Sequence, residues 1–345
     1  MKAFRIHGPL DMRLEDVEKP GIDDDEVLIK VLYTGICTTD KELYDGSMPY
    51  FEQGLSKRPM TAGHEWSGTV EAIGKNVAHL TPGDLVVGDI SIGCGKCGNC
   101  LRGQYHLCDN RTELGVIRYD GSFAEYLKTD GKNVYKVPEG VSAREAALVE
   151  PLATVLYAVR RTGIDPGDSV AVFGDGPIGL LNAQLANTCG ASKVIVVGRK
   201  ETHRERIEGW GLHFINSSKV NAMEGIADIF GDQADVVFED TGNADVFDTA
   251  VKSVRPGGRI CALSITGVPK IPVDVDYIAT RDIAVIGVLA SPNSFRPALK
   301  MIASGKVDVA GCISHEFPFE KTLEAFEFVR NSSGKDRIKV LVKGL

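Results

Sequence analysis

Residues 169–198 read SVAVFGDGPIGLLNAQLANTCGASKVIVVG, and this stretch decides the fold of the second half of the chain. Its first six residues resemble a strand and lead into a glycine turn. Residues 177–190 then have the apolar spacing of a helix, with Pro177 in the first turn and Gly190 as the stop signal. Residues 193–198 form a continuous apolar run, which is typical of a strand buried on both faces of a parallel sheet. The stretch therefore predicts strand, helix and strand in succession.

The same alternation continues toward the C-terminus. Further strand-like runs occur at 234–240, 258–264 and 283–287, with helical stretches between them. This rhythm predicts a doubly wound parallel sheet of the Rossmann type. Beyond about residue 287 the sequence predicts a helix in 292–305 and a short last strand in 337–344.

The first third of the chain has a different pattern. Short strand-like runs occur at 26–35, 68–74 and 84–90, and Gly, Asp and Pro separate them. This pattern predicts a compact antiparallel domain. The length of 345 residues also favours two domains over a single core. The expected fold class is α/β, with a parallel-sheet domain and a mainly-β domain.

A glycine motif follows the strand at 169–173. Residues 174–179, GDGPIG, match G-x-G-x-x-G directly after a strand and at the start of a helix. In that context the backbone amides can approach a pyrophosphate, and the helix N-terminus favours its charge. A tight turn without a ligand is the weaker alternative. The expected coenzyme-binding residues of the motif are Gly174, Gly176, Pro177, Ile178 and Gly179.

The end of the next strand predicts which dinucleotide binds. An NAD site usually places Asp or Glu there to bond the ribose 2′-hydroxyl. This chain has Gly198, Arg199 and Lys200 instead, with Arg204 a little further on. Glycine leaves room, and the cations can bind a 2′-phosphate. We therefore predict NADP in preference to NAD, with a plain solvated turn as the alternative.

Four cysteines form a compact group. Cys94, Cys97, Cys100 and Cys108 have C-x2-C-x2-C-x7-C spacing, which is typical of four thiolates around one tetrahedral zinc ion. A site closed in this way is structural. It directs attention to a second, incomplete ligand set that could hold a catalytic zinc ion.

The candidates for that second set are Cys37, His64, Glu65 and Glu150. Thiolate, imidazole and carboxylate are ordinary zinc ligands, and three of them leave a position open. Taken singly, each residue also has a structural interpretation, as a buried filler, a core histidine or a helix cap. Their occurrence together with the glycine motif and the four cysteines favours a catalytic metal site.

These motifs carry a resemblance to a known family. The segments GICTTD, GHEWSGTVEAIG, PGDLVVGD, CGKCGNCLRGQYHLC, DGSFAEY, EPLATVLYA and VAVFGDGPIG occur in this order along the chain. Together they resemble the zinc-dependent medium-chain dehydrogenase/reductase superfamily. Glu150 stands where alcohol dehydrogenases with two cysteine ligands have the second cysteine. This departure is similar to the polyol and sugar dehydrogenase branch, of sorbitol, glucose or cyclitol type.

The resemblance implies the domain organisation. Residues 1–152 and 288–345 would form a GroES-like catalytic domain, with a zinc lobe at 91–110. Residues 153–287 would form the dinucleotide-binding Rossmann domain. The apolar edge at 283–291 would pair with a second subunit, as in the family, giving a homodimer or homotetramer.

The resemblance also implies roles for individual residues. Cys37 and His64 match two zinc ligands, and Glu65 and Glu150 match two acidic positions. Either acid binds the catalytic zinc directly or holds the water on the metal, and the sequence leaves this choice open. Thr39 matches the hydroxyl that passes a proton from the substrate oxygen. Asp40 matches the carboxylate that orients the ligand histidine. A relay histidine of some relatives is replaced here by Glu42.

The implied function is hydride transfer between NADP(H) and a secondary alcohol or ketone of a polyol, cyclitol or aminocyclitol. It implies one catalytic and one structural zinc ion and a small polyhydroxylated substrate. Two alternatives stay open. One is an NADPH-binding sensor or structural protein without turnover. The other is a dehydrogenase of a hexose or a simple secondary alcohol.

Composition bears on partners and location. The net charge is -8 and the pI about 5.5, so no basic face for nucleic acid is expected. The N-terminal residues have no long apolar segment, and no apolar run approaches a membrane span. The clustered cysteines favour metal binding in a reducing compartment. We therefore predict a cytoplasmic protein with no membrane partner.

Overall fold

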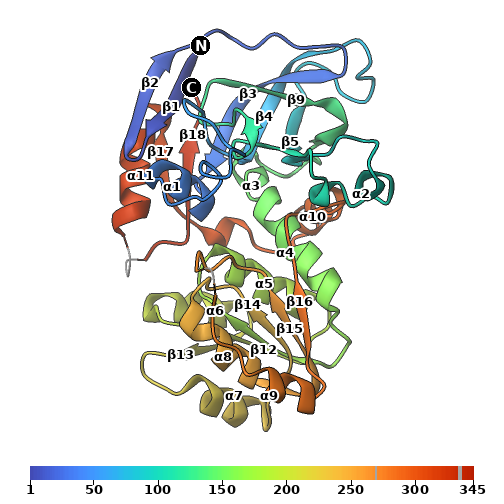
Figure 1. Cartoon of the computed structure of the whole chain (residues 1–345), viewed down its shortest axis with the longest axis vertical. Helices are drawn as coiled ribbons and strands as arrows, with labels where there is room; N and C mark the ends of the chain where they lie inside the picture. The colour runs from blue at the N-terminus through green and yellow to red at the C-terminus, as the bar shows by residue number, and fades with distance from the viewer. Residues whose placement is uncertain (269, 333–335) are drawn as a thin grey trace.

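The computed structural model describes residues 1–268, 270–332 and 336–345. Figure 1 shows two parts, with helix α4 (Val149–Thr162) running between them. One part holds a parallel sheet with helices around it, and the other holds the antiparallel strands and both chain termini. The mixed α/β class predicted from the sequence is confirmed.

The parallel sheet has the strand order β13-β12-β11-β14-β15-β16, and every neighbouring pair is parallel. Renumbered within the sheet this is 3-2-1-4-5-6, the Rossmann order. The strands are β11 (Ser169–Phe173), β12 (Lys193–Gly198), β13 (His213–Asn216), β14 (Ala234–Glu239), β15 (Val254–Ala262) and β16 (Ala284–Gly287).

Alternation along the strands explains why helices cover both faces of this sheet. In β11, Val170 and Val172 pack in the apolar cluster that contains residues of α4 and α5. Ala171 and Phe173 of the same strand pack in a different cluster, with residues of α7 and α8. Successive side chains of a strand point to opposite faces, so a wholly apolar strand needs a helix layer on each side. The helices are α5 (Pro177–Thr188), α6 (Arg204–Gly209), α7 (Ala222–Phe230), α8 (Ala244–Lys252) and α9 (Val275–Thr280).

The second part is built on a mainly antiparallel sheet with the path β10-β5-β4-β3-β18-β17, and β9 also pairs with β3. Residues from opposite ends of the chain meet here, because the last strand pairs with β3 at Leu341 and Gly35. The strands are β3 (Glu26–Gly35), β4 (Glu65–Ile73), β5 (Leu85–Gly88), β9 (Tyr126–Asp130), β10 (Val134–Lys136), β17 (Ile313–Pro318) and β18 (Lys339–Lys343).

Smaller elements complete this part. Two short sheets contain β1 (Lys2–Gly8) with β2 (Asp11–Asp16), and β6 (Ser91–Ile92) with β7 (Thr112–Leu114) and β8 (Arg118–Tyr119). The helices are α1 (Thr38–Asp45), α2 (Gly98–Leu101), α3 (Ala143–Ala146), α10 (Phe295–Ala303) and α11 (Thr322–Asn331). Single 3-10 turns occur at Tyr105–Leu107, Gly131–Asn133, Glu201–His203, Ala310–Cys312 and Phe319–Lys321.

We keep 1–152 with 288–345, and 153–287, as the proposed domain boundaries. Residue 152 lies inside α4, whose buried face joins the same apolar cluster as α5 and α10. The two proposed domains thus share one core at their junction. In the part of the chain that the structure describes, no helix is long and apolar enough to span a membrane.

Candidate metal centre and coenzyme site

One buried carboxylate joins the two segments that carry the predicted ligands Cys37 and His64. Asp40 lies in the first turn of α1 and is fully buried. Its Oδ2 accepts a hydrogen bond from the backbone amide of Cys37 at 2.9 Å, and its Oδ1 accepts one from Gly63 at 3.0 Å. The same Oδ1 lies 3.2 Å from His64 Nδ1, within ion-pair distance. Asp40 therefore holds the backbone of both segments, and its carboxylate lies next to the imidazole ring of His64.

Three of the predicted ligands come together. Donor atoms of Cys37, His64 and Glu65 lie within 4.8 Å of one another. The pairing of β3 with β4 places Gly35 opposite Glu65, and a Cβ at Gly35 would be 2.3 Å from Glu65 Oε2. Glycine at position 35 thus leaves space for the carboxylate. A thiolate, an imidazole and a carboxylate at this spacing fit a zinc ion with one open position.

The charge around His64 also suits a metal ligand. Burial works against protonation, but Asp40 and Cys37 beside the ring raise the pKa of His64 well above its ordinary value. Negative charge beside the ring favours a positive charge at this position. A zinc ion would supply that charge while leaving the ring neutral, as metal binding requires.

Sequence reasoning missed Lys339, on the last strand of the chain. Its Nζ donates to both carboxylate oxygens of Glu65 at 2.6 Å, and to the carbonyl of Ile36 at 3.3 Å. Both side chains are almost completely buried, at 4% and 2% exposed. Burial lowers the pKa of Lys339, but Glu65 and Cys37 outweigh it, so the net shift is upward. No local sequence signal marks this lysine, because 274 residues separate it from Glu65.

Glu150 lies just outside the three-residue group. It occupies the first turn of α4 and is buried, and Thr154 Oγ1 donates to it at 3.3 Å. Burial raises the pKa of Glu150 to about 7, with His64 acting against the shift and Glu65 adding to it. Glu150 is therefore close enough to His64 and Glu65 for their charges to shift its pKa. Its carboxyl can hold or release a proton near neutral pH.

The remaining catalytic candidates lie on α1. Thr39 follows Cys37 by two residues and is half-buried. Glu42, which replaces the relay histidine of some relatives, is also half-buried, and burial raises its pKa. The two residues are three apart on one helix, so they share a face of α1.

The four cysteines of the predicted lobe also come together. The Sγ atoms of Cys94, Cys97, Cys100 and Cys108 lie within 4.8 Å of one another, and all four thiols are free. Cys94 and Cys100 are 4.0 Å apart, against about 3.8 Å expected for two thiolates on a tetrahedral zinc ion with bonds of about 2.3 Å. Backbone amides of Lys96 and Cys97 lower the pKa of Cys94 to about 6, which favours a thiolate. This donor set fits a closed structural zinc site.

The glycine motif forms an open cradle. Gly176 caps α5, with Pro177 next in the helix and Ile178 following it. A Cβ at Gly179 would be 2.1 Å from the carbonyl oxygen of Gly174, so only glycine allows the helix to approach the strand. Apart from the adjoining residues, no atom of the described residues lies within 4 Å of the position of a Cβ at Gly176. The turn before this helix therefore has room for a pyrophosphate next to the helix N-terminus.

The cations predicted to bind a 2′-phosphate differ in their surroundings. Arg199 is exposed, and its guanidinium has no recorded partner among the described residues. Lys200 Nζ donates to the carbonyl of Arg337 at 2.9 Å. Arg204 pairs with Glu201 at 2.5 Å and with Glu208 at 3.0 Å. Arg199 is thus the most available of the three.

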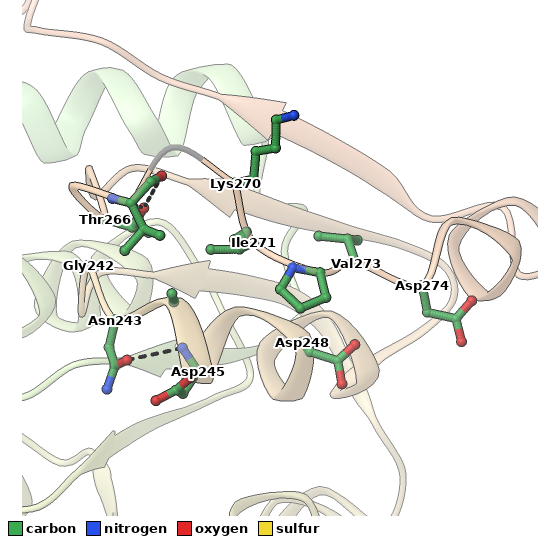
Figure 2. A pocket seen from close by; sticks show the side chains of 12 residues that line it. Gly242, Asn243, Asp245, Asp248, Thr266, Lys270, Ile271, Val273 and Asp274 are labelled. Atoms are coloured by element: carbon green, nitrogen blue, oxygen red, sulfur yellow. Dashed lines mark hydrogen bonds between the residues drawn. The ribbon is translucent and has the colours of Figure 1, made fainter.

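A separate pocket lies in the Rossmann part, between the start of α8 and the loop that leads to α9. Figure 2 shows Asn243 bonded to the amide of Asp245 at its rim. None of the predicted metal or coenzyme residues lines this pocket. Its lining residues are Gly242, Asn243, Ala244, Asp245, Asp248, Thr266, Val268, Lys270, Ile271, Pro272, Val273 and Asp274.

This fold and these two ligand sets have counterparts among known proteins. Residues 23–139 match the model of the alcohol dehydrogenase GroES-like domain, and residues 177–304 match that of the zinc-binding dehydrogenases. The chain belongs to the zinc-dependent medium-chain dehydrogenase/reductase superfamily.

Individual relatives place the chain in the polyol dehydrogenase branch of that superfamily. Sorbitol dehydrogenase of Bacillus subtilis is 33% identical over 330 residues, which are 95% of this chain and 93% of the relative. Sorbitol dehydrogenase of Ovis aries is also 33% identical, over 98% of this chain and 95% of the relative. The chain is thus a zinc-dependent alcohol or polyol dehydrogenase.

Solved structures agree with the assignment to the superfamily. A protein of Sinorhizobium meliloti 1021, described as a zinc-binding dehydrogenase bound to NADP, superimposes with a TM-score of 0.92 at 32% identity. The match covers 99% of this chain and 98% of that one. An alcohol dehydrogenase of Thermus sp. ATN1 gives a TM-score of 0.91 at 30% identity, over the whole of both chains.

Proposed function

We propose that the protein oxidises a secondary alcohol of a polyol, cyclitol or aminocyclitol to the ketone, reversibly and with NADP(H) as the preferred coenzyme. The observation that carries this proposal is the buried group of Cys37, His64 and Glu65, whose donor atoms lie within 4.8 Å of one another. The sorbitol dehydrogenases that are similar to this chain support a polyhydroxylated substrate.

We assign separate roles to the zinc ion, the coenzyme and the residues of the chain. Zinc supplies a Lewis acid and the nicotinamide supplies hydride chemistry. Cys37, His64 and Glu65 would hold the ion, since these three cluster and Glu150 lies outside their group. Asp40 would keep the imidazole in position, and Thr39 would move the proton at the substrate oxygen.

Glu150 and the four-cysteine lobe complete the proposal. With a pKa raised to about 7, Glu150 can accept a proton in one direction of the reaction and return it in the other. Cys94, Cys97, Cys100 and Cys108 would hold the second, structural zinc ion.

The test of this function combines turnover with metal analysis. We expect NADP⁺-dependent oxidation of at least one polyol or cyclitol in a broad panel, and about two zinc ions per chain. A chelator should remove one zinc faster than the other, and activity should fall in step with that first loss. Binding of NADPH without turnover of any polyol, ketose or alcohol would favour the sensor alternative. Oxidation of only a hexose or a simple secondary alcohol would favour the other alternative.

The preference for NADP(H) is supported by the missing acid at the end of β12 and by the exposed Arg199. We expect Arg199→Ala to raise the Michaelis constant for NADPH at least about five-fold, because one cation–phosphate contact is lost. The constant for NADH should change little. Steady-state kinetics with both coenzymes measure this effect. Equal kinetics with NADPH and NADH in the parent protein would overturn the assignment.

We further propose a homodimer or homotetramer formed through the edge strand β16. Among the described residues, β16 pairs on one side only, with β15, and Val285 on this strand is 45% exposed. An exposed apolar edge strand is a template for pairing with a second chain. A cytoplasmic location remains a prediction from the sequence.

A further inference from the structure

The space expected beside Gly198 is occupied. Gly198 stands where many dinucleotide-binding sheets carry the acid that reads the ribose. A Cβ built on Gly198 would lie 2.5 Å from both Cβ and Oδ2 of Asp175. The glycine therefore accommodates the side chain of Asp175, which comes from the glycine motif that follows the neighbouring strand.

Asp175 is held in this place by the backbone. Its Oδ2 accepts hydrogen bonds from the amide of Arg199 at 2.9 Å and from that of Lys200 at 2.7 Å. The imidazole Nδ1 of the buried His203 lies 3.0 Å from the backbone carbonyl of Asp175. The carboxylate of Asp175 thus accepts from the two amides that follow β12. The imidazole of His203 contacts the backbone carbonyl of the same residue and so helps to hold the turn.

The other oxygen of this carboxylate is available. The side chain of Asp175 is 14% exposed, and Oδ1 has no recorded hydrogen-bond partner among the described residues. An acid at position 198 and the carboxylate of Asp175 would fill the same volume, although position 198 ends β12 and Asp175 lies in the turn after β11. Asp175 therefore presents a negative charge at the place from which the coenzyme ribose is usually read.

We infer that Asp175 is a specificity-determining residue that accepts the adenosine ribose 2′-hydroxyl of NAD(H) and opposes the 2′-phosphate of NADP(H). A carboxylate favours a hydroxyl donor and repels a phosphate dianion. Arg199, exposed on the same turn, acts in the opposite direction. The ratio of the affinities for NADP(H) and NAD(H) depends on these two opposed charges. The proposed preference for NADP(H) is therefore small.

This inference rests on the proposed coenzyme site but not on turnover. The experiment therefore uses calorimetric binding of two fragments, 5′-AMP and adenosine 2′,5′-bisphosphate, to the full chain. Asp175→Asn removes the charge and keeps an oxygen that can accept both amides, and Asp175→Ala leaves the two amides free. In both variants we expect the affinity ratio of the bisphosphate to 5′-AMP to rise at least about five-fold, as for one like-charge contact.

Glu205→Gln is the matched control, because Glu205 is an exposed acid on the nearby helix α6. It should change the ratio by less than about two-fold, since screening weakens an exposed charge at longer range. An unchanged ratio in both Asp175 variants, with both fragments still bound, would overturn the role of Asp175 and leave the dehydrogenase function standing. Failure of both fragments to bind the parent protein would overturn the coenzyme site itself, and the role of Asp175 with it.

Discussion

Cys37→Ser is expected to lower kcat/KM for polyol oxidation by about a thousand-fold or more, with the fold intact. The loss follows because a neutral hydroxyl is a poor zinc ligand, and Lewis-acid stabilisation is worth several kcal/mol at about 1.4 kcal/mol per factor of ten. Cys37 is the N-cap residue of α1. Serine is a better cap than cysteine, so the helix should not suffer. Steady-state kinetics, zinc content and thermal unfolding together measure the result.

Cys97→Ser is the matched control for this prediction. It makes the same chemical change in the four-cysteine group, where Cys97 caps the short helix α2. We expect the second zinc to be lost and the midpoint of thermal unfolding to fall, since structural zinc contributes directly to folding. The protein that remains folded should keep measurable turnover.

Hydrogen bonds of Tyr105 connect the four-cysteine lobe to the rest of the protein. The hydroxyl of Tyr105, in the lobe, donates to the buried Asp89 at 2.5 Å and accepts from the amide of Asn293 at 2.8 Å. Loss of the structural zinc should therefore loosen the segment that precedes α10.

Undiminished oxidation in Cys37→Ser would rule out the proposed catalytic site, whatever the result for Cys97→Ser.

Lys339→Met is expected to destabilise the metal-free protein by about 3–5 kcal/mol, because it leaves the Glu65 carboxylate buried without its partner. Methionine has a similar length and adds no polar group, so packing should be largely kept. With zinc bound the loss should be smaller, since the ion supplies the missing positive charge. Urea unfolding with and without a chelator measures both values.

Two further variants identify the cause of this loss. Lys343→Met changes an exposed lysine on the same strand and should have an effect within about 0.5 kcal/mol. The double variant Glu65→Gln with Lys339→Met removes both charges, and it should recover more than half of the stability lost in the metal-free protein. Equal losses for the two lysine variants, or no recovery in the double variant, would contradict the role of the ion pair.

The sequence alone predicted most of the architecture, because the relevant signals are local. The strand, glycine turn and helix of 169–190 follow from apolar periodicity and from residues with special backbone preferences. The cysteine spacing of 94–108 is equally local, and it brings four thiols together in the structure. Cys37, His64, Glu65 and Glu150 were predicted as candidate ligands, and the choice between the two glutamates was left open. The structure brings donor atoms of the first three within 4.8 Å of one another, beside the pairing of β3 with β4.

Two features were decided only by the tertiary structure. Lys339 meets Glu65 because the last strand returns to pair with β3, and no local pattern predicts a contact across 274 residues. Gly198 suggested free space for a phosphate, but the parallel pairing of β11 with β12 brings Asp175 into that space. Periodicity and spacing determine which elements form and which residue types they carry. Long-range packing determines which strands become neighbours, and the order of the strands determines which charged side chains face a given ligand.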